Sequence, residues 1–361
     1  NLYLMMIKQI KQSSKDIICF FAHLILWVIV GTYIGTKLAV FDATQYQVDL
    51  PKQFYVNGKF DFFHYPDTLR GYVLPFISLI LRKISSITHI DNYYVVLYFL
   101  TFLFALITGF LIPSIAKIVV AKSNKFFISG ACFVFMFIFW RGYLQYLLSD
   151  VPAMVCFLIA VYFLLKPIKK YHAFIVGLFG TMAINIRMAY FVAFVLIAII
   201  LLIRFYLDKK TLDIKKQLRS GLLAVLLLFI GFSAISIPQL IINRNISHKN
   251  SFFPQSDIGR DDYPTPLGPV PLGVSSLAVF QLSVGLPIQK YETSIEVSTE
   301  AKIYYLDTNG MKLVEKYLPI YSEADYLKMW IKSPVQVTAL NLRHILNGLD
   351  IRYSTPYITN S

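Results

Sequence analysis

The stretch YHAFIVGLFGTMAINIRMAYFVAFVLIAIILLI, residues 171–203, decides how this chain folds. It is apolar throughout except at Asn185, Arg187 and the ring of His172. One helix of this length would put the lysines before it and the basic cluster after it on opposite sides of a membrane. Two short spans that turn at residues 185–187 keep both basic clusters on one side, as the positive-inside rule favours, so we expect two spans.

The rest of the chain has the composition of a membrane protein. Of its 361 residues, 57% are hydrophobic and only 15% are charged, and its mean hydropathy is +0.60. A soluble domain carries roughly 25% charged residues, so this composition excludes a soluble globular enzyme and a disordered protein. We interpret the net charge of +14 as positive-inside bias, and we expect no nucleic-acid partner.

The sequence contains no motif typical of a cofactor-binding or metal-binding site. The three cysteines, Cys19, Cys132 and Cys156, lie in apolar runs, where we expect small buried hydrophobic residues and no disulfide framework. The spacings typical of zinc sites, P-loops and dinucleotide-binding folds are not found. We therefore expect no metal and no cofactor.

With residues 171–203 as two spans, the whole sequence predicts an all-α polytopic membrane protein with about seven transmembrane helices and a cytoplasmic N-terminus. Residues 71–81 are apolar but short. If they crossed the membrane, the lysine cluster within residues 117–125 would lie outside, so we predict an interfacial helix in the first outer loop, with Arg82 and Lys83 at its surface end. The predicted spans are residues 17–36, 93–116, 126–140, 151–165, two within 171–203, and 221–242.

This topology divides the chain into two domains. Residues 1–245 form the transmembrane module, and residues 246–361 form a mixed extracytoplasmic region. In that region, the sequence Ser-Glu-Ala-Asp at residues 322–325 predicts one helix start and the Ser333-Pro334 pair predicts another. Residues 274–286 are apolar but too short to span, which predicts a packed or interfacial segment. We expect the chain to stop before further transmembrane helices.

Two carboxylates on the predicted outer face are candidate catalytic residues. Asp42 lies just past the outer end of the first span. A partly desolvated carboxylate at a membrane surface can have a raised pKa and can deprotonate a hydroxyl as a general base; the alternative is an ordinary interfacial carboxylate. Asp150 lies where the fourth span begins. Ser149 or Asp150 also fits the cap of that helix, with Pro152 in its first turn, and the two roles are compatible.

Three arginines are candidate ligands for a phosphate group. Arg187 lies in an apolar stretch, where an arginine costs roughly 2.5–3.5 kcal/mol at the bilayer centre, so it should face a cavity or a partner or snorkel to the surface. A guanidinium can donate paired hydrogen bonds to the phosphate of an anionic headgroup. Arg141 and Arg70 are weaker candidates for the same task. His64, in the polar segment of residues 61–67, is a candidate acceptor or sugar contact; solvated loop polarity and a metal site are the alternatives.

Short motifs in the first 245 residues resemble those of the GT-C membrane glycosyltransferases, which include protein O-mannosyltransferases and lipid A aminoarabinose transferases. Asp42 is followed by Tyr46 and by QFYVNGK at residues 53–59, similar to the family's acidic residue, aromatic residue and hydrophobic–Asn–Gly segment. The sequence LSDVPA at residues 148–153 is similar to its Ser-acidic-Pro entry into the fourth span. Residues 177–188 are similar to its Gly-rich span that ends in a basic residue.

The resemblance implies a sugar transferred with inversion from a polyprenyl-phosphate donor to a glycan, lipid or protein acceptor. It implies an integral protein of a bacterial inner or plasma membrane, in contact with membrane lipids and with an extracytoplasmic active site. By the resemblance, Asp42 is the catalytic base, Arg187 contacts the donor phosphate and Tyr46 contacts the acceptor or the sugar. Ala43 and Thr44 depart from the second acidic residue of many members, and the first loop lacks the Asp-x-Asp of the metal-dependent oligosaccharyltransferase branch.

Two other functions stay open at this point. An O-antigen or polysaccharide polymerase or ligase also uses polyprenyl-linked sugars, but such enzymes usually depend on arginine-rich outer loops. A non-enzymatic flippase for lipid-linked sugars predicts charges at mid-membrane depth and repeated halves. The charges of this chain are expected at one face instead, which favours the transferase.

Overall fold

The computed structural model describes two compact units. The first unit contains the described residues up to Pro254, except residues 137–143. The second unit contains residues 137–143 and the described residues beyond 254. The described residues are 2–34, 45–66, 71–120, 123–166, 169–207, 214–248, 250–254, 279, 282, 284–285, 305–318, 320 and 323–348.

The first unit is built from long helices, because its apolar runs satisfy their backbone hydrogen bonds within each helix. The stretch 171–203 folds as two helices, α9 (Lys170–Ile186) and α10 (Phe191–Leu207), joined by the turn η5 (Met188–Tyr190), so the predicted break at residues 185–187 is confirmed. The other helices are α1 (Leu2–Ile34), α4 (Val73–Thr88), α5 (Asn92–Ala105), the π-helical segment η3 (Leu106–Leu111), α6 (Ile112–Val119), α7 (Lys125–Trp140), α8 (Asp150–Leu165) and α11 (Ile214–Ser247).

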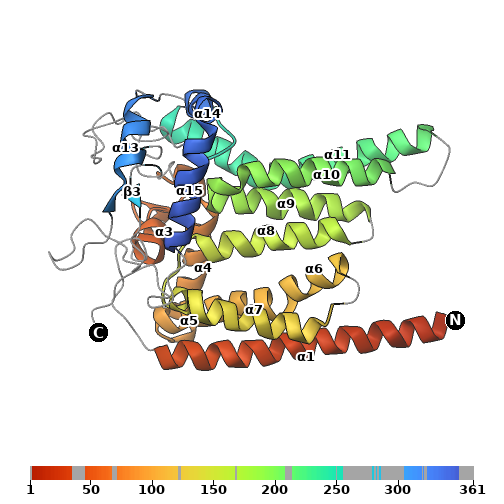
Figure 1. Cartoon of the computed structure of the whole chain (residues 1–361). Helices are drawn as coiled ribbons and strands as arrows, with labels where there is room; N and C mark the ends of the chain where they lie inside the picture. The colour runs from red at the N-terminus through yellow and green to blue at the C-terminus, as the bar shows by residue number, and fades with distance from the viewer. Residues whose placement is uncertain are drawn as a thin grey trace. The chain divides into compact units, whose positions relative to one another are not determined.

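The long helices lie side by side and alternate in direction (Figure 1). The C-terminal ends of α6, α8 and α10 and the N-terminal ends of α7, α9 and α11 share one end of the bundle, which we call the Lys166 end. Contacts at this end include Arg204 Nη2 donating to the Lys166 carbonyl (3.2 Å) and Lys125 Nζ bound to Asp16 Oδ1 (2.6 Å). The junction of α9 with α10 lies at the opposite end, which we call the Arg187 end.

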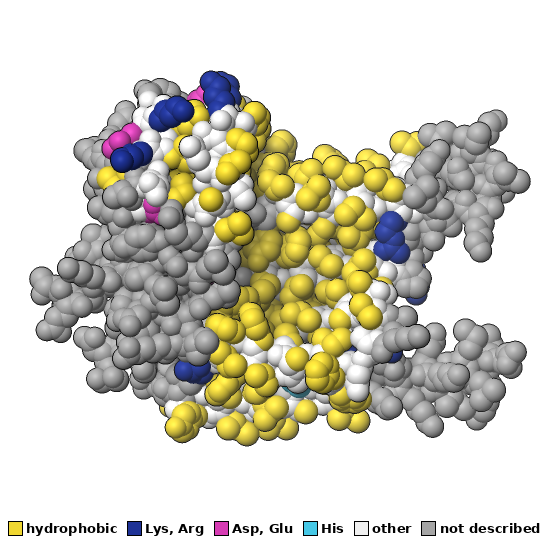
Figure 2. Space-filling model, in the orientation of Figure 1, with side chains coloured by type: hydrophobic (Ala, Val, Ile, Leu, Met, Phe, Trp, Pro, Cys, Tyr) yellow, Lys and Arg dark blue, Asp and Glu magenta, His cyan; other side chains and the backbone are white. Residues whose placement is uncertain are grey.

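The surface of the bundle is apolar. Hydrophobic side chains cover the part of the helices in view (Figure 2). A soluble monomer rarely exposes such a surface, whereas a membrane protein presents it to lipid. Four described helical stretches are long and apolar enough to cross a membrane, and three apolar helices are shorter, which identifies an all-α, membrane-type fold. The four are Asp16–Tyr33, Asn92–Val119, Lys125–Gln145 and Gly221–Ser247; the three are Asp150–Leu165, Tyr171–Ile186 and Met188–Arg204.

Glycines allow α9 and α11 to pack closely. A Cβ atom on Gly177 would lie 2.2 Å from the Leu228 carbonyl oxygen, and one on Gly231 would lie 2.3 Å from the Phe174 carbonyl oxygen. Small residues permit such close helix approach in membrane proteins. The Gly-rich character of residues 177–180 therefore has a packing explanation.

The loop after α1 contains a small hairpin. Strands β1 (Tyr55–Val56) and β2 (Lys59–Phe60) pair antiparallel across Asn57 and Gly58, whose φ angles are 50° and 77°. Two positive φ angles in a two-residue hairpin turn select Asn-Gly. The Asn-Gly pair that contributes to the family resemblance is thus also what this turn requires. The described parts of the loop also include η1 (Gln45–Asp49), α3 (Leu50–Lys52) and η2 (Phe62–His64).

The apolar segment at residues 71–81 forms the start of α4. The helix does not end at Arg82 and Lys83, as predicted, but continues to Thr88. Arg82 Nη1 donates to the carbonyls of Gln47 (3.2 Å) and Val48 (3.5 Å), so the arginine packs against η1.

The second unit has its own apolar core and a short antiparallel pair, β3 (Val284–Gly285) with β4 (Tyr305–Leu306). Its helices are α13 (Thr308–Glu315), α14 (Glu323–Lys332) and α15 (Pro334–Gly348). The start predicted at Ser333-Pro334 is confirmed, although the Ser333 hydroxyl bonds to the Tyr317 hydroxyl (2.9 Å). Ser322 lies outside the described residues. The core residues are Val279, Leu282, Leu313, Val314, Ile320, Met329, Val337 and Leu340.

Candidate functional site

An ion pair between Arg187 and Asp150 lies at the Arg187 end of the bundle. Arg187 Nη1 is 2.7 Å from Asp150 Oδ1 and donates to Ser149 Oγ at 3.3 Å. Two of the predicted site residues are therefore brought together. Their side chains are 44% and 40% exposed, and an exposed pair of this kind contributes only about 0–1 kcal/mol to stability. Its main effect is to hold the guanidinium in place.

The local backbone explains how these groups meet. Helix α9 ends at Ile186, and Arg187 adopts an extended conformation (φ −149°, ψ 107°) before η5. Ser149 occupies the N-cap position of α8, one of the two positions expected, and its side chain makes no capping hydrogen bond to the backbone. Asp150 lies in the first turn of α8, where a carboxylate complements the positive end of the helix dipole. Within the described residues, Nε and Nη2 of Arg187 have no hydrogen-bond partner.

Three buried amide side chains lie beside this ion pair and form what we call the amide relay: Asn185, Gln239 and Asn243. They are 3%, 0% and 0% exposed. Asn185 Nδ2 donates to Gln239 Oε1 (2.8 Å), and Gln239 Nε2 donates to Asn243 Oδ1 (2.9 Å). At one end of the relay the Val73 amide donates to Asn185 Oδ1 (3.0 Å), and at the other Asn243 Nδ2 donates to the carbonyls of Ser251 (2.8 Å) and Phe253 (2.7 Å).

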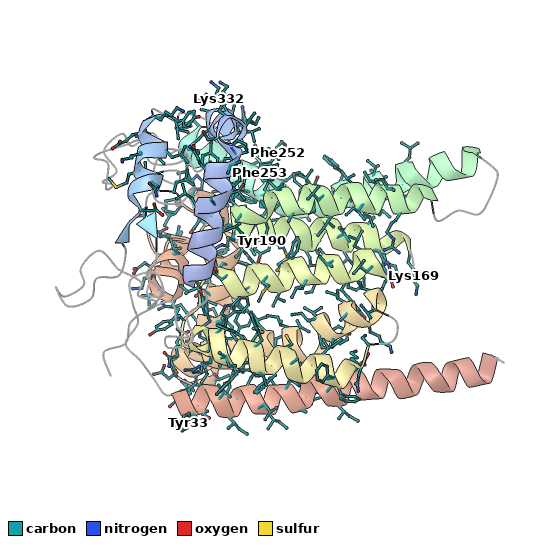
Figure 3. All side chains as sticks on the ribbon, viewed as in Figure 1. Tyr33, Lys169, Tyr190, Phe252, Phe253 and Lys332 are labelled. Atoms are coloured by element: carbon teal, nitrogen blue, oxygen red, sulfur yellow. The ribbon has the colours of Figure 1, made fainter. Side chains whose placement is uncertain are left out.

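The amide relay joins three parts of the chain that are distant in sequence: the start of α4, the end of α9, and the end of α11 with the segment after it. The ring of Phe253 packs edge-on to that of Phe191 (5.2 Å between centroids), at the start of α10. Tyr190, Phe252 and Phe253 accordingly gather at one end of the helices, and Lys169 lies at the other (Figure 3). The first unit therefore extends to Pro254, past the boundary expected at residue 245, because Asn243 holds residues 251–253 against α11.

Gly71 makes the closest approach to the amide relay. A Cβ atom at this position would lie 2.0 Å from the backbone oxygen of Asn185 and 2.3 Å from its Oδ1. No side chain fits there, so this glycine is required for α4 to begin against α9.

A second polar region at the Arg187 end is an open hollow of about 400 Å³. We call it the polar hollow; its lining residues are His64, Arg244, Asn245, His248 and Asn250. His64 belongs to η2 in the first loop, and the other four lie at or just after the end of α11. Asn245 Nδ2 joins the two walls by donating to the Phe63 carbonyl (3.2 Å).

His64 is oriented by Asp61. Its Nδ1 lies 2.7 Å from Asp61 Oδ2, while Asp61 Oδ1 accepts from the Phe63 amide (3.2 Å). The hydrogen bond from His64 holds the pKa of the Asp61 carboxyl below its usual value, so Asp61 stays ionised and keeps its partner at neutral pH. With Nδ1 engaged, Nε2 is the ring nitrogen left for a ligand.

The remaining predicted site residues are not brought to the ion pair by the described structure. Asp42 and Arg70 lie outside the described residues, and so does the side chain of Tyr46. Arg141 Nη1 donates to the carbonyls of Phe137 (3.1 Å) and Ile138 (3.0 Å), so the arginine caps the last turn of α7. This contact assigns Arg141 a local structural role.

Sequence reasoning missed the amide relay, Arg244 and a buried cluster inside the bundle. Gln239 and Asn243 are four residues apart, on one face of α11 at the end of its apolar stretch, and that spacing is a signal for a polar contact. The buried cluster, here the His23 cluster, lies between α1, η3 and α7. Its members are Cys19, His23, Trp27, Thr108 and Ser129.

Comparisons with protein-family models, with curated proteins and with solved structures find no match.

Proposed function

We propose that this protein is a membrane glycosyltransferase that moves a sugar from a polyprenyl-phosphate donor to a glycan, lipid or protein acceptor at the extracytoplasmic face. In this proposal the Lys166 end faces the cytoplasm, the Arg187 end faces outward, and seven helices cross a bacterial inner or plasma membrane. The charge distribution supports this orientation, because Lys117 lies in the last turn of α6, Lys125 begins α7, and Lys166 and Lys169 flank the gap between α8 and α9, all at the Lys166 end.

The proposal rests on one observation: the guanidinium of Arg187 is bonded to Asp150 and Ser149 at the end of an apolar bundle. Asp150 and Ser149 hold it through Nη1, and its other nitrogens are left to donate to a phosphate. Helix α10 begins four residues later and exposes Val192, Leu196 and Ile199. A polyprenyl phosphate has a matching form, since its apolar chain can follow such a surface while its phosphate lies near Arg187.

The proposed roles combine the contacts of Arg187 with the family resemblance, which makes Asp42 the base. The Asp42 carboxylate takes the proton of the acceptor hydroxyl, and the acceptor oxygen attacks the anomeric carbon on the face opposite the phosphate. The bond between that carbon and the phosphate oxygen breaks, and polyprenyl phosphate leaves with the negative charge stabilised by Arg187. Asp150 is a positioning residue for Arg187, because its carboxylate is already bound to the guanidinium.

The test is sugar transfer by the purified full chain in lipid nanodiscs, with a radiolabelled polyprenyl-phosphate sugar and an extracted glycan-lipid acceptor pool. Asp42→Asn keeps the side chain's shape and removes the base, so turnover should fall by about 10²–10⁴-fold with donor binding retained. Asp49→Asn, a matched loss of an exposed carboxylate in the same loop, should leave turnover near normal. Near-normal turnover in Asp42→Asn would refute the assignment of the base.

The same assay separates the alternatives. A flippase would move the labelled donor across a membrane and form no new glycosidic bond. A polymerase or ligase would require an acceptor or donor that already carries a polymerised glycan.

A further inference from the structure

The polar hollow has a fixed backbone frame, and three of its five lining side chains have no partner among the described residues. Arg244, His248 and Asn250 are exposed, and none of them has a hydrogen-bond or ion-pair partner among the described residues. Donors that stand on a fixed backbone without a protein partner are available to a ligand.

The wall formed by the end of α11 is fixed by buried contacts. Asn243, next to Arg244, is fully buried and bonds to Gln239 and to the carbonyls of residues 251 and 253. Ser247 Oγ donates to the Asn243 carbonyl (2.7 Å), and His248 ends the helix in the left-handed conformation (φ 54°). The chain after the helix is therefore turned back so that His248 and Asn250 both line the hollow.

The wall formed by the first loop is equally well supported. Beneath His64, the rings of Phe54 and Tyr65 stack (4.7 Å between centroids), and Phe62 packs edge-on to Tyr72 (5.1 Å). Phe54 and Tyr65 are fully buried. Asp61 fixes the His64 ring through Nδ1, as described above.

We propose that the polar hollow binds an oxyanion, a phosphate or carboxylate group, carried by the acceptor. The lining supplies the guanidinium of Arg244, the amides of Asn245 and Asn250 and the imidazole of His248, all of which can donate to oxygen. His64, whose Nδ1 is bound to Asp61, adds a donor at Nε2 when its ring is protonated. The carboxylate next to the hollow, Asp61, is engaged by His64 and by the Phe63 amide. The assignment to the acceptor rests on the proposed function; the anion site itself does not.

Position separates this site from the proposed donor site. Asn185, two residues before Arg187, bonds to Gln239, and Arg244 follows Gln239 by five residues on the same helix. Five residues of α-helix advance roughly 7 Å, away from the bundle. Arg244 thus lies beyond the amide relay on the side that faces outward in the proposed orientation, where a water-borne acceptor group would approach, and neither Arg187 nor Asp150 lines the hollow.

The competing explanation is that Arg244 and His248 only offset the negative end of the α11 dipole. The two explanations predict different results for Arg244→Gln. A dipole role changes stability and leaves anion binding untouched. A ligand role changes anion binding and leaves the folded protein intact, since the Arg244 side chain is exposed.

The first experiment is calorimetric titration of the purified full chain with inorganic phosphate, glucuronate and glucose. Phosphate and glucuronate should bind saturably and glucose should not. Arg244→Gln should weaken phosphate binding by about tenfold, as expected for one charged hydrogen bond, and His248→Asn should weaken it less. The matched control is Lys59→Gln, which removes an exposed cation from the first-loop hairpin and should have no effect. Absence of saturable phosphate binding up to about 10 mM, an equal loss in the control, or glucose binding as tightly as phosphate would overturn the site.

The second experiment uses transfer with a phosphate-bearing or carboxylate-bearing acceptor and its neutral analogue. Arg244→Gln should lower kcat/KM about tenfold for the anionic acceptor only. If phosphate binding is lost in Arg244→Gln but both acceptors react normally, the assignment to the acceptor is overturned and the anion site stands. If no acceptor is glycosylated by the native protein, the proposed function fails, and the phosphate titration still decides the site on its own.

Discussion

The His23 cluster and the Arg187 end are both polar regions of one apolar bundle, but they differ in what their groups are bonded to. In the His23 cluster the polar atoms bond to one another. The Ser129 hydroxyl donates to the Thr108 carbonyl (2.8 Å) and accepts from His23 Nε2 (2.8 Å), while His23 Nδ1 and Trp27 Nε1 lie 2.9 and 3.0 Å from Thr108 Oγ1. At the Arg187 end, buried amides are paired in the same way, but Arg187 and Arg244 keep donors without a partner in the described structure.

The difference separates polar groups that hold helices together from polar groups that can bind a ligand. The His23 cluster sits where η3 widens into π-helical turns and a close approach of α1 at Gly109 brings the two helices together. Hydrogen bonds between membrane helices act as local links of modest strength. The Arg187 end combines such links, in the amide relay, with charged groups that they position.

The largest effect on stability should come from breaking the amide relay. Gly71→Ala places a Cβ atom 2.0 Å from the Asn185 backbone oxygen, and the shift that relieves this contact should cost about 3 kcal/mol. The unfolding midpoint of the purified protein in detergent measures it. Gly130→Ala in α7 is the control, because a Cβ atom there meets nothing within 4 Å. Equal midpoints for the two variants would show that the contact at Gly71 is not as tight as described.

A smaller effect is expected from the His23 cluster. Ser129→Ala removes the hydroxyl that bonds both His23 and the Thr108 carbonyl, and it should lower stability by about 1 kcal/mol. Turnover per folded molecule should not change. Thr32→Ala, which removes an exposed hydroxyl bonded within α1, should change neither quantity. A loss of turnover in folded Ser129→Ala protein would contradict the structural role and remove the contrast between the two regions.

The smallest stability effect, with the clearest functional one, is expected for the ion pair. Asp150→Asn should lower stability by less than about 1 kcal/mol, because both side chains are partly exposed. It should raise the KM for the polyprenyl-phosphate donor by up to about fivefold, the factor that corresponds to 1 kcal/mol, and leave kcat less affected, since the guanidinium loses its partner. Asp325→Asn breaks the exposed pair with Lys328 in the second unit and should leave the donor KM unchanged. An unchanged donor KM in Asp150→Asn would contradict the proposal that Asp150 positions Arg187.

Much of the helix layout was predictable because it depends on local patterns. The break at Arg187 follows from a charged residue in an apolar run, and the α15 start at Pro334 follows from the Ser-Pro pair. The predicted end of α4 was several residues too early. Arg82 bonds to carbonyls of η1 inside the folded loop, and this contact cannot be read from the local sequence.

The candidate site was predictable only in part. Asp150 and Arg187 were found separately, from a helix start and from a charge in an apolar run, but their pairing depends on which helices are neighbours. The amide relay and the polar hollow require α11 to pack against α9 and η2, and no local pattern contains that information. Asp42, the proposed base, lies outside the described residues and stays a prediction.

The most direct test of the account is the sidedness of the two ends of the bundle. Single cysteines replace Met188, at the Arg187 end and 42% exposed, and Lys169, at the Lys166 end and also exposed, in a chain with Cys19, Cys132 and Cys156 changed to alanine. Intact cells are then treated with a membrane-impermeant maleimide. Met188→Cys should be labelled in intact cells, and Lys169→Cys should be labelled only after permeabilisation. Labelling of Lys169→Cys from outside would contradict it, because the Arg187 end would then face the cytoplasm or the stretch 171–203 would cross only once.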